Sequence, residues 1–305
     1  MKRETLTART IFAAFRAIPL SIRKALFKAL AILFYHFSEK NRLIVLHNLT
    51  CAFPEKSMVE LKKVARGCYR HLAIVVAEFF DILSITRDNI SDWMEFEGRD
   101  RENYEKAHAK NKGIIFFTGH FGNWEFLPVA CAILYQPINI VYREMDDPVI
   151  REIVDRVRRH SGTQLIPKGG AARRLIRFLS RNENVGILAD QNVAWREGVF
   201  VDFFGRPAST TSGLAAIALQ TGAPVLPAFT YRMKDGRYRL FVWQEVDIIR
   251  TGDYNRDILE NTQRFTNIIE VMIREHPEQW FWLHQRWKTK KSQVVEIPRK
   301  QASRA

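Results

Sequence analysis

The chain has 305 residues, of which 47% are hydrophobic and 26% charged, a composition typical of a globular protein and not of a disordered chain. The three cysteines, Cys51, Cys68 and Cys131, are far apart, which argues against a disulfide framework or a cysteine zinc site and favours a reducing compartment. The net charge of +14 is concentrated at the two ends, because residues 1–50 carry +7 (nine Lys or Arg against two Glu) and residues 286–305 carry +6 (seven against one). Basic ends around a nearly neutral body favour contact with an anionic membrane surface, whereas a nucleic-acid-binding domain more often spreads its basic residues over the folded body.

The N-terminal region favours helices. Its longest nearby stretch without Lys, Arg, Asp or Glu, residues 29–38, has ten residues, whereas a bilayer-spanning helix needs about 20 apolar ones. No small-residue cleavage site follows an apolar core, so we expect no secretory signal. The pattern predicts a basic amphipathic helix in the membrane interface, although it also suits a helix packed on the protein's own core. After Pro19, a helix breaker, the apolar residues at helical spacing are Leu20, Leu26, Phe27, Leu30, Phe34 and Phe37, with Arg23, Lys24 and Lys28 between them.

From residue 113 onward, short apolar runs alternate with helical patterns. This alternation implies an α/β fold with a central, largely parallel sheet flanked by helices, in which ligands usually bind beyond the carboxyl ends of the strands. We expect three regions: an N-terminal helical, membrane-associating region over residues 1–95, an α/β core over 96–288, and a basic, disordered tail over 289–305. We expect strands at about 114–117, 138–142, 185–189, 199–203 and 225–229, and helices at about 57–83, 125–134, 147–162, 171–180, 212–220 and 255–275.

The segment after the first core strand carries the residues best suited to catalysis. His120 ends that strand, and Glu125 lies five residues on, where a turn can bring its carboxylate back to the imidazole. A histidine held by a carboxylate is a better-oriented and stronger base, able to take the proton from a hydroxyl that attacks an acyl carbonyl. From spacing alone, the more common interpretation is structural: a satisfied histidine at a strand end and a glutamate in the first turn of a helix.

The motif Gly119-His120-x-x-x-x-Glu125 resembles the signature of the lysophospholipid acyltransferase superfamily, which is a histidine followed, after four residues, by Asp or Glu. Other segments resemble, in order, the sequence blocks of the late acyltransferases of lipid A biosynthesis, the lauroyl and myristoyl transferases. The resemblance covers about residues 10–290, and its specificity lies in the ordered set rather than in any single segment. These segments are 48–54, 141–143 with Arg156 and Arg158, 190–192, 203–211 with 222–227, and 280–287.

The resemblance implies transfer of a fatty acyl chain from a thioester, on acyl carrier protein or coenzyme A, to a hydroxyl of a phosphorylated glycolipid, a lipid A precursor. It also implies the cytoplasmic face of the cell inner membrane, with peripheral or monotopic attachment, and no cofactor or metal. His120 and Glu125 are the expected catalytic pair. The expected substrate-binding residues are Arg143, Arg156, Arg158, Asp190, Gly205 and Thr210.

The chemistry of these residues agrees with such roles to different degrees. The planar fork of an arginine suits phosphate because it can donate two hydrogen bonds. Asp190 follows a strand, where an aspartate more often caps backbone amides than takes part in catalysis. Gly205 and Thr210 are expected to shape a loop near the donor thioester. Trp280, Trp282 and Trp287 suit either a lipid interface or the core.

Three other interpretations stay open. An acyltransferase acting on another glycolipid or on a lysophospholipid would share the motif. A lipid hydrolase needs a nucleophile, and the usual Gly-x-Ser-x-Gly motif is absent from the sequence. A non-catalytic, basic membrane-binding protein explains the charged ends but not a histidine and a glutamate on an α/β core. The other histidines, including His71 and His284, have no carboxylate at a suggestive spacing and are expected to be structural.

Overall fold

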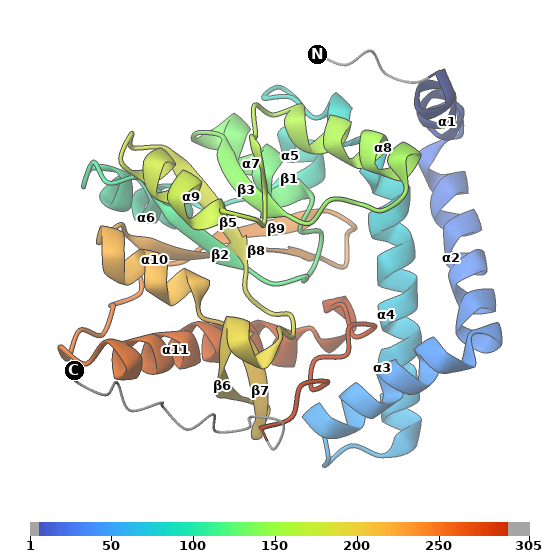
Figure 1. Cartoon of the computed structure of the whole chain (residues 1–305). Helices are drawn as coiled ribbons and strands as arrows, with labels where there is room; N and C mark the ends of the chain where they lie inside the picture. Colours follow the sequence, from blue (N-terminus) through green and yellow to red (C-terminus); the bar gives the residue numbers. More distant parts are fainter. Residues whose placement is uncertain (1–5, 292–305) are drawn as a thin grey trace.

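The computed structural model describes residues 6–291, which form an α/β body with a set of N-terminal helices along one side (Figure 1). The body is built on a seven-stranded sheet of order β1-β9-β8-β2-β5-β3-β4. The pair β8–β9 is antiparallel, and the other pairs recorded in this sheet are parallel, so the expected α/β class is confirmed. The strands are β1 (Met94–Glu95), β2 (Ile115–Thr118), β3 (Ile138–Tyr142), β4 (Leu165–Pro167), β5 (Asn184–Leu188), β8 (Val225–Arg232) and β9 (Tyr238–Val242).

Helices cover both faces of this sheet, which is why its central strand is apolar without interruption. Phe116 of β2 packs into a core with α6, α7 and α8, whereas Ile115 and Phe117 pack into a second core with α9, α10 and α11. The helices of the body are α6 (Gly98–His108), α7 (Phe126–Leu134), α8 (Pro148–Arg159), α9 (Ala171–Leu179), α10 (Gly213–Thr221) and α11 (Tyr254–Glu275), with the 3-10 turns η2 (Trp195–Glu197) and η3 (Pro277–Gln279). Asp147 caps α8 with its carboxylate and Pro148 follows at the first position, a common way for a helix to begin.

A two-stranded hairpin, β6 (Gly198–Phe203) and β7 (Arg206–Thr211), lies beside the sheet and packs on α11. Its turn is Phe204-Gly205, with φ values of 56° and 70°, a region where glycine is strongly favoured. The backbone N–H of Gly205 donates to Asp202 Oδ1 at 2.7 Å. Gly205 is therefore explained by the turn of the hairpin.

The N-terminal region is helical, as predicted, and α4 is its central element. Pro19 separates the first two helices, and Ser57 with Glu60 forms a capping box at the start of α4 (Met58–Phe79). Within residues 6–291, none of the helices combines the length and the apolar character that crossing a bilayer requires. The elements are α1 (Leu6–Ala17), α2 (Leu20–Phe37), α3 (Glu39–Ala52), α4 (Met58–Phe79), η1 (Ile82–Ser84) and α5 (Ile90–Trp93). The predicted tail over 289–305 falls almost entirely outside the described residues.

The structure shows which side of α2 faces the protein, a point that the amphipathic pattern of this helix left open. Arg23 is 1% exposed and pairs with Asp81, and Lys24 Nζ lies 2.7 Å from Glu78 Oε1. Buried charges need partners, and these two carboxylates at the end of α4 draw the cations of α2 inward.

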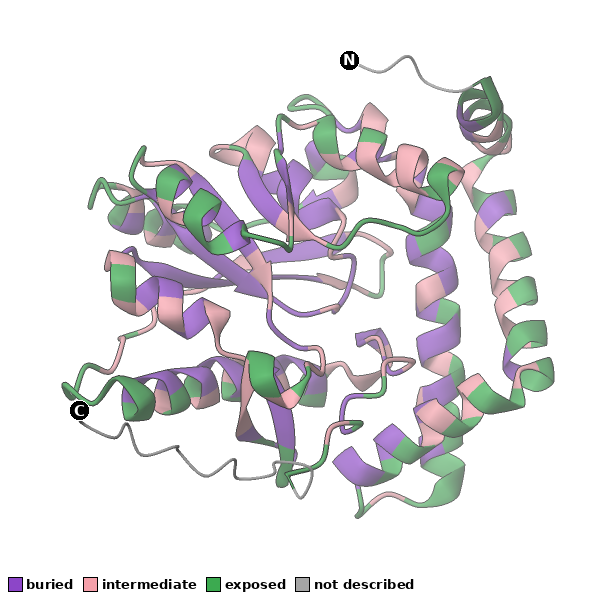
Figure 2. Cartoon of the chain, in the orientation of Figure 1, coloured by how far each residue is buried: buried purple, intermediate pink, exposed green. Residues whose placement is uncertain are grey.

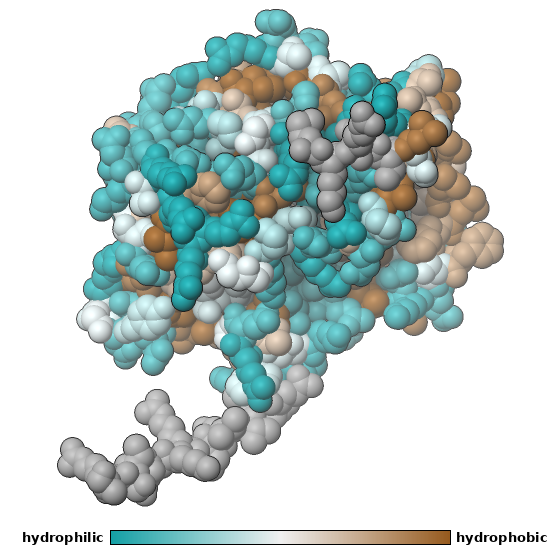
Figure 3. All heavy atoms as spheres, turned by 45° about the horizontal axis from the view of Figure 1, so that its top comes forward, coloured by the Kyte–Doolittle hydropathy of each residue, from teal (hydrophilic) through white to brown (hydrophobic). Residues whose placement is uncertain are grey.

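The opposite side of α2 is exposed to solvent (Figure 2). One row along the helix, the apolar row of α2, consists of Ile22, Leu26, Leu30, Leu33, Phe34 and Phe37, whose exposed fractions run from 46% to 84%. Apolar side chains also gather on this side of the molecule in the space-filling view (Figure 3). An exposed apolar row of this size is typical of a surface that contacts another apolar phase.

Candidate active site

His120 and Asp190 each lie two residues after the end of a strand, and the two strands are neighbours in the sheet. Strands β2 and β5 are parallel, with Thr118 opposite Leu188. Each chain runs two residues further, which brings His120 and Asp190 side by side beyond the carboxyl ends of the strands. The backbone N–H of Ala189 donates to the carbonyl of Thr118 at 3.0 Å, so the ladder extends up to the pair.

The imidazole of His120 is held through Nδ1. This nitrogen lies 2.9 Å from Asp190 Oδ1, and the backbone N–H of His120 donates to Asp190 Oδ2 at 2.7 Å. A carboxylate on Nδ1 favours the tautomer that carries its proton there, which leaves Nε2 able to accept a proton. Nε2 lies 3.4 Å from Gln191 Nε2, and the His120 side chain is 24% exposed. The pair can therefore act as a partly open, oriented base.

Asp190 is buried and accepts three hydrogen bonds at its two oxygens. Besides the two from His120, the indole N–H of Trp280 donates to Oδ2 at 2.7 Å. Burial by itself would raise the pKa of Asp190, but the charge of His120 and the hydrogen bonds from His120 and Trp280 outweigh it and hold this pKa at about 2. Asp190 is therefore a carboxylate at neutral pH.

Glu125 does not take the place predicted for it, because it is Asp190 that contacts the imidazole. Arg158 of α8 donates from Nε to Glu125 Oε2 at 2.9 Å and also bonds the other oxygen, and Trp124 Nε1 donates to Glu125 Oε1 at 3.1 Å. The physical reason is the counter-charge: Arg158 is largely buried beside Glu125, and a buried guanidinium needs a carboxylate. Glu125 thus joins the loop of His120 to α8.

The segment after α11 holds the backbone of the loop 119–123. The carbonyl of Gln279 accepts from the N–H of Gly122 at 2.9 Å, and the N–H of Phe281 donates to the carbonyl of His120 at 2.9 Å. Gly122 has a φ of 57°, and a Cβ there would lie 1.5 Å from the carbonyl oxygen of Thr230. Close packing, rather than the approach of a substrate, therefore requires glycine at this position.

The three C-terminal tryptophans, Trp280, Trp282 and Trp287, are buried, so they belong to the core and not to a lipid interface. In the same segment, His284 Nε2 accepts from the N–H of Asn192 at 2.7 Å. The expected structural role of His284 agrees with this contact.

The remaining predicted binding residues lie apart from the imidazole. Arg143 is 83% exposed and lies 3.5 Å from Asp146, whereas Arg156 stacks over the ring of Phe12 in α1 at 4.9 Å. Thr210 is buried in β7, opposite Asn192, and bonds Arg286. The structure thus brings Asp190 to His120 directly and Arg158 to the same loop through Glu125. Sequence reasoning missed Trp280 as the second donor to Asp190, since no local pattern singles it out among three tryptophans.

His71 of α4 supports the same loop and makes stability depend on pH. Its Nε2–H donates to the carbonyl of Gly122 at 2.9 Å, and burial lowers its pKa to about 4, although this hydrogen bond acts in the opposite direction. An unfolded imidazole titrates near pH 6.5, so between about pH 6.5 and 4 the unfolded state binds a proton that the folded state does not. The contribution of His71 is therefore complete above about pH 6.5 and is lost as the pH falls.

We expect up to about 3 kcal/mol of unfolding free energy to be lost by pH 4 through this residue. This prediction is checked by measuring the free energy of unfolding in denaturant for the parent and for His71→Gln at a series of pH values from neutral to about 4. The glutamine keeps an N–H donor but does not titrate, so its stability should fall less steeply. Equal pH slopes for the two proteins would exclude His71 as the source.

Within residues 6–291, no group of three or more His, Cys, Asp or Glu side chains is arranged to hold a metal ion. What the fold and the site do define is the arrangement needed for general-base chemistry on a hydroxyl: an oriented, partly exposed histidine at the carboxyl edge of a parallel sheet. The model of the bacterial lipid A biosynthesis acyltransferases matches residues 7–289. The chain belongs to this family and is accordingly an acyltransferase of the lipid A type.

Individual relatives agree with this assignment. The chain is 27% identical over 256 residues to the lipid A biosynthesis palmitoleoyltransferase of Escherichia coli (strain K12), covering 83% of this chain and 81% of that protein. It is 24% identical over 278 residues to a lipid A biosynthesis acyltransferase of Haemophilus influenzae, covering 90% and 84%. It is also 26% identical over 192 residues to the phosphatidylinositol mannoside acyltransferase of Mycolicibacterium smegmatis, covering 62% and 61%.

Proposed function

We propose that the protein transfers a fatty acyl chain from a thioester, on acyl carrier protein or coenzyme A, to a hydroxyl of a lipid A precursor. The observation that carries this proposal is the His120–Asp190 pair, in which the carboxylate holds Nδ1 and leaves Nε2 as the other nitrogen of a partly exposed ring. Nε2 takes the proton of the acceptor hydroxyl while its oxygen attacks the thioester carbonyl. The new C–O bond forms, the C–S bond breaks, and the proton passes from His120 to the departing thiolate.

The other predicted residues have supporting roles in this scheme. Glu125 and Arg158 fix the position of the loop by their ion pair, so they act as positioning residues. Arg143 has the exposure to meet a phosphate of the acceptor, for which an arginine fork is well suited. Arg156, Gly205 and Thr210 act from further away, through the packing of α8 on α1 and through the hairpin β6–β7.

A second candidate function is the same acyl transfer to a different lipid acceptor. The similarity to phosphatidylinositol mannoside acyltransferases, over about three fifths of the chain, favours another phosphorylated glycolipid as the alternative. Acyl transfer by the purified protein, with lipid A precursors, mannosylated phosphatidylinositols and lysophospholipids competing as acceptors, decides between them. Product on the lipid A precursor supports the proposal, product on another lipid moves the activity to that acceptor, and no product with any acceptor contradicts it.

The acceptor is a lipid, and the apolar row of α2 supports contact with the cytoplasmic face of the inner membrane through this helix. Since Arg23 and Lys24 are turned toward Asp81 and Glu78, the contact would depend mainly on apolar burial and less on lipid charge. Each large apolar side chain buried contributes roughly 1.5–3 kcal/mol.

Replacing Leu30, Phe34 and Phe37 together by serine should lower vesicle affinity by at least roughly 100-fold, in neutral and in anionic vesicles alike. Cosedimentation with the two vesicle types measures it. The matched control is Leu259→Ser with Val271→Ser on α11, which are also exposed and apolar and should leave binding unchanged. A loss confined to anionic vesicles, or an equal loss in the control, would rule out this surface.

A further inference from the structure

A second concentration of arginine lies outside the site, on α9. Residues 168–182 hold five Lys or Arg and no Asp or Glu. The helix is divided between a buried side, formed by Leu175, Phe178 and Leu179, and an exposed basic side. The exposed basic residues, which we call the α9 basic surface, are Lys168, Arg173, Arg174, Arg177 and Arg181.

Three of these arginines converge around one hollow. Arg174 and Arg177 are three residues apart on α9 and share one face of this helix, and Arg181 lies in the turn that follows its end. With Gln164 and Phe178 they line a hollow of about 210 Å³. In the described part of the chain, no carboxylate forms an ion pair with any of these three guanidinium groups. Their charge is therefore available to an anionic partner from outside.

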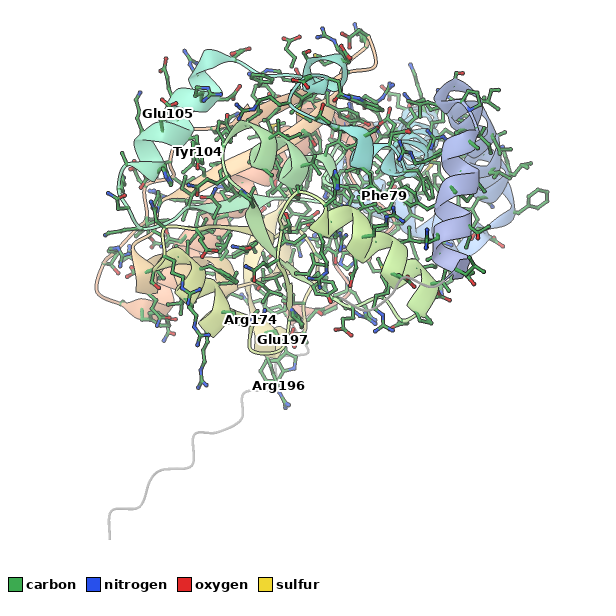
Figure 4. All side chains as sticks on the ribbon, turned by 90° about the horizontal axis from the view of Figure 1, so that it is seen from above. Phe79, Tyr104, Glu105, Arg174, Arg196 and Glu197 are labelled. Carbon is green, nitrogen blue, oxygen red and sulfur yellow. The ribbon has the colours of Figure 1, made fainter. Side chains whose placement is uncertain are left out.

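The position of this surface separates it from the lipid-facing side. In the view from above, Arg174 lies apart from the N-terminal helices that carry the apolar row of α2, with α8 between them (Figure 4). Figure 1 shows the same separation, with α9 and α2 at opposite sides of the sheet. A molecule that rests on a bilayer through α2 would thus hold the α9 basic surface away from the lipid headgroups.

The surface nevertheless begins at the edge of the sheet that holds His120. Strand β4 ends at Pro167, directly before Lys168, the first residue of the α9 basic surface. Three inter-strand spacings separate β4 from β2, so the two strands are roughly 14 Å apart. Lys168 at its start pairs with Glu197 at 2.6 Å, next to the hairpin whose Thr210 lies opposite Asn192. A partner lying along α9 would therefore have one end near the active site.

We propose that the α9 basic surface docks an acidic acyl carrier protein that delivers the thioester to His120, an inference that rests on the proposed function. Carboxylates on the surface of an acidic partner can each meet an arginine fork, which gives geometry as well as attraction. Nucleic acid is the less suitable anion, because residues 51–285 carry a net charge of only +1 and offer no extended basic track.

The test is charge reversal by Arg174→Glu with Arg181→Glu, compared with Arg99→Glu and Lys106→Glu on α6, an exposed pair at the same spacing. The first measurement is binding of unacylated carrier protein by fluorescence anisotropy, which requires no catalysis. The α9 variant should bind at least roughly tenfold more weakly, and the control should bind like the parent. Unchanged binding by the α9 variant, or equal losses in both variants, would overturn the inference.

The second measurement is acyl transfer from two donors, acyl carrier protein and acyl-pantetheine, which lacks the protein. The α9 variant should show a raised KM for the carrier-linked donor, an unchanged kcat, and unchanged rates with acyl-pantetheine. A KM raised for both donors would mean a defect of the site itself and would overturn the inference, as would a loss of vesicle binding instead of carrier binding. If the parent binds the carrier at α9 but transfers no acyl group, the proposed function fails while the docking surface stands.

Discussion

Replacing His120 by alanine is expected to lower kcat for acyl transfer by about 10²–10⁴-fold, the usual contribution of a positioned general base. The reason is that the acceptor hydroxyl is too weakly acidic to attack a thioester efficiently while it keeps its proton. Removal of the imidazole leaves Asp190 buried and without its partner, so it cannot replace the base. Initial rates with saturating donor and acceptor measure the effect.

The matched control for this experiment is His160→Ala, which removes an exposed imidazole at the end of α8. It should react as fast as the parent. Thermal unfolding of both variants shows whether the fold is kept. A His120→Ala protein that is folded and reacts at the parental rate would contradict the mechanism.

Replacing Asp190 by asparagine should lower kcat by a factor on the order of 10³, because the ring loses the carboxylate that orients it and stabilises its protonated form. Replacing Glu125 by glutamine should affect the rate less, since Glu125 bonds Arg158 and Trp124 rather than His120. The sequence motif favours Glu125 as the partner of His120, whereas the structure favours Asp190.

A spectroscopic measurement separates the two carboxylates without relying on the rate. The Nδ1 proton of His120, hydrogen-bonded to Asp190, should give a downfield proton signal in NMR spectra. We expect this signal to disappear in Asp190→Asn and to remain in Glu125→Gln. Its loss in Glu125→Gln and survival in Asp190→Asn would restore the pairing that the sequence motif favours.

The sequence by itself determined the class of fold and the place of the histidine that we propose as the base. Continuous apolar runs such as Ile114–Phe117 are required by strands buried on two faces, and capping signals such as Asp147 and Ser57 mark helix starts locally. Strands β1, β4, β7 and β9 and helix α6 were not predicted. Strands β1 and β4 are short, and strands such as β7 become regular only through pairing with a neighbour.

Tertiary structure decided which partners the functional residues have. Glu125 is five residues from His120 and Asp190 is seventy, yet the parallel register of β2 and β5 brings the distant carboxylate to the ring, while a buried Arg158 takes the near one. The same holds for α2, whose pattern showed an amphipathic helix but not which side faces outward. That choice depends on carboxylates at the end of α4, more than fifty residues along the chain, because a buried charge is stable only beside its counter-charge.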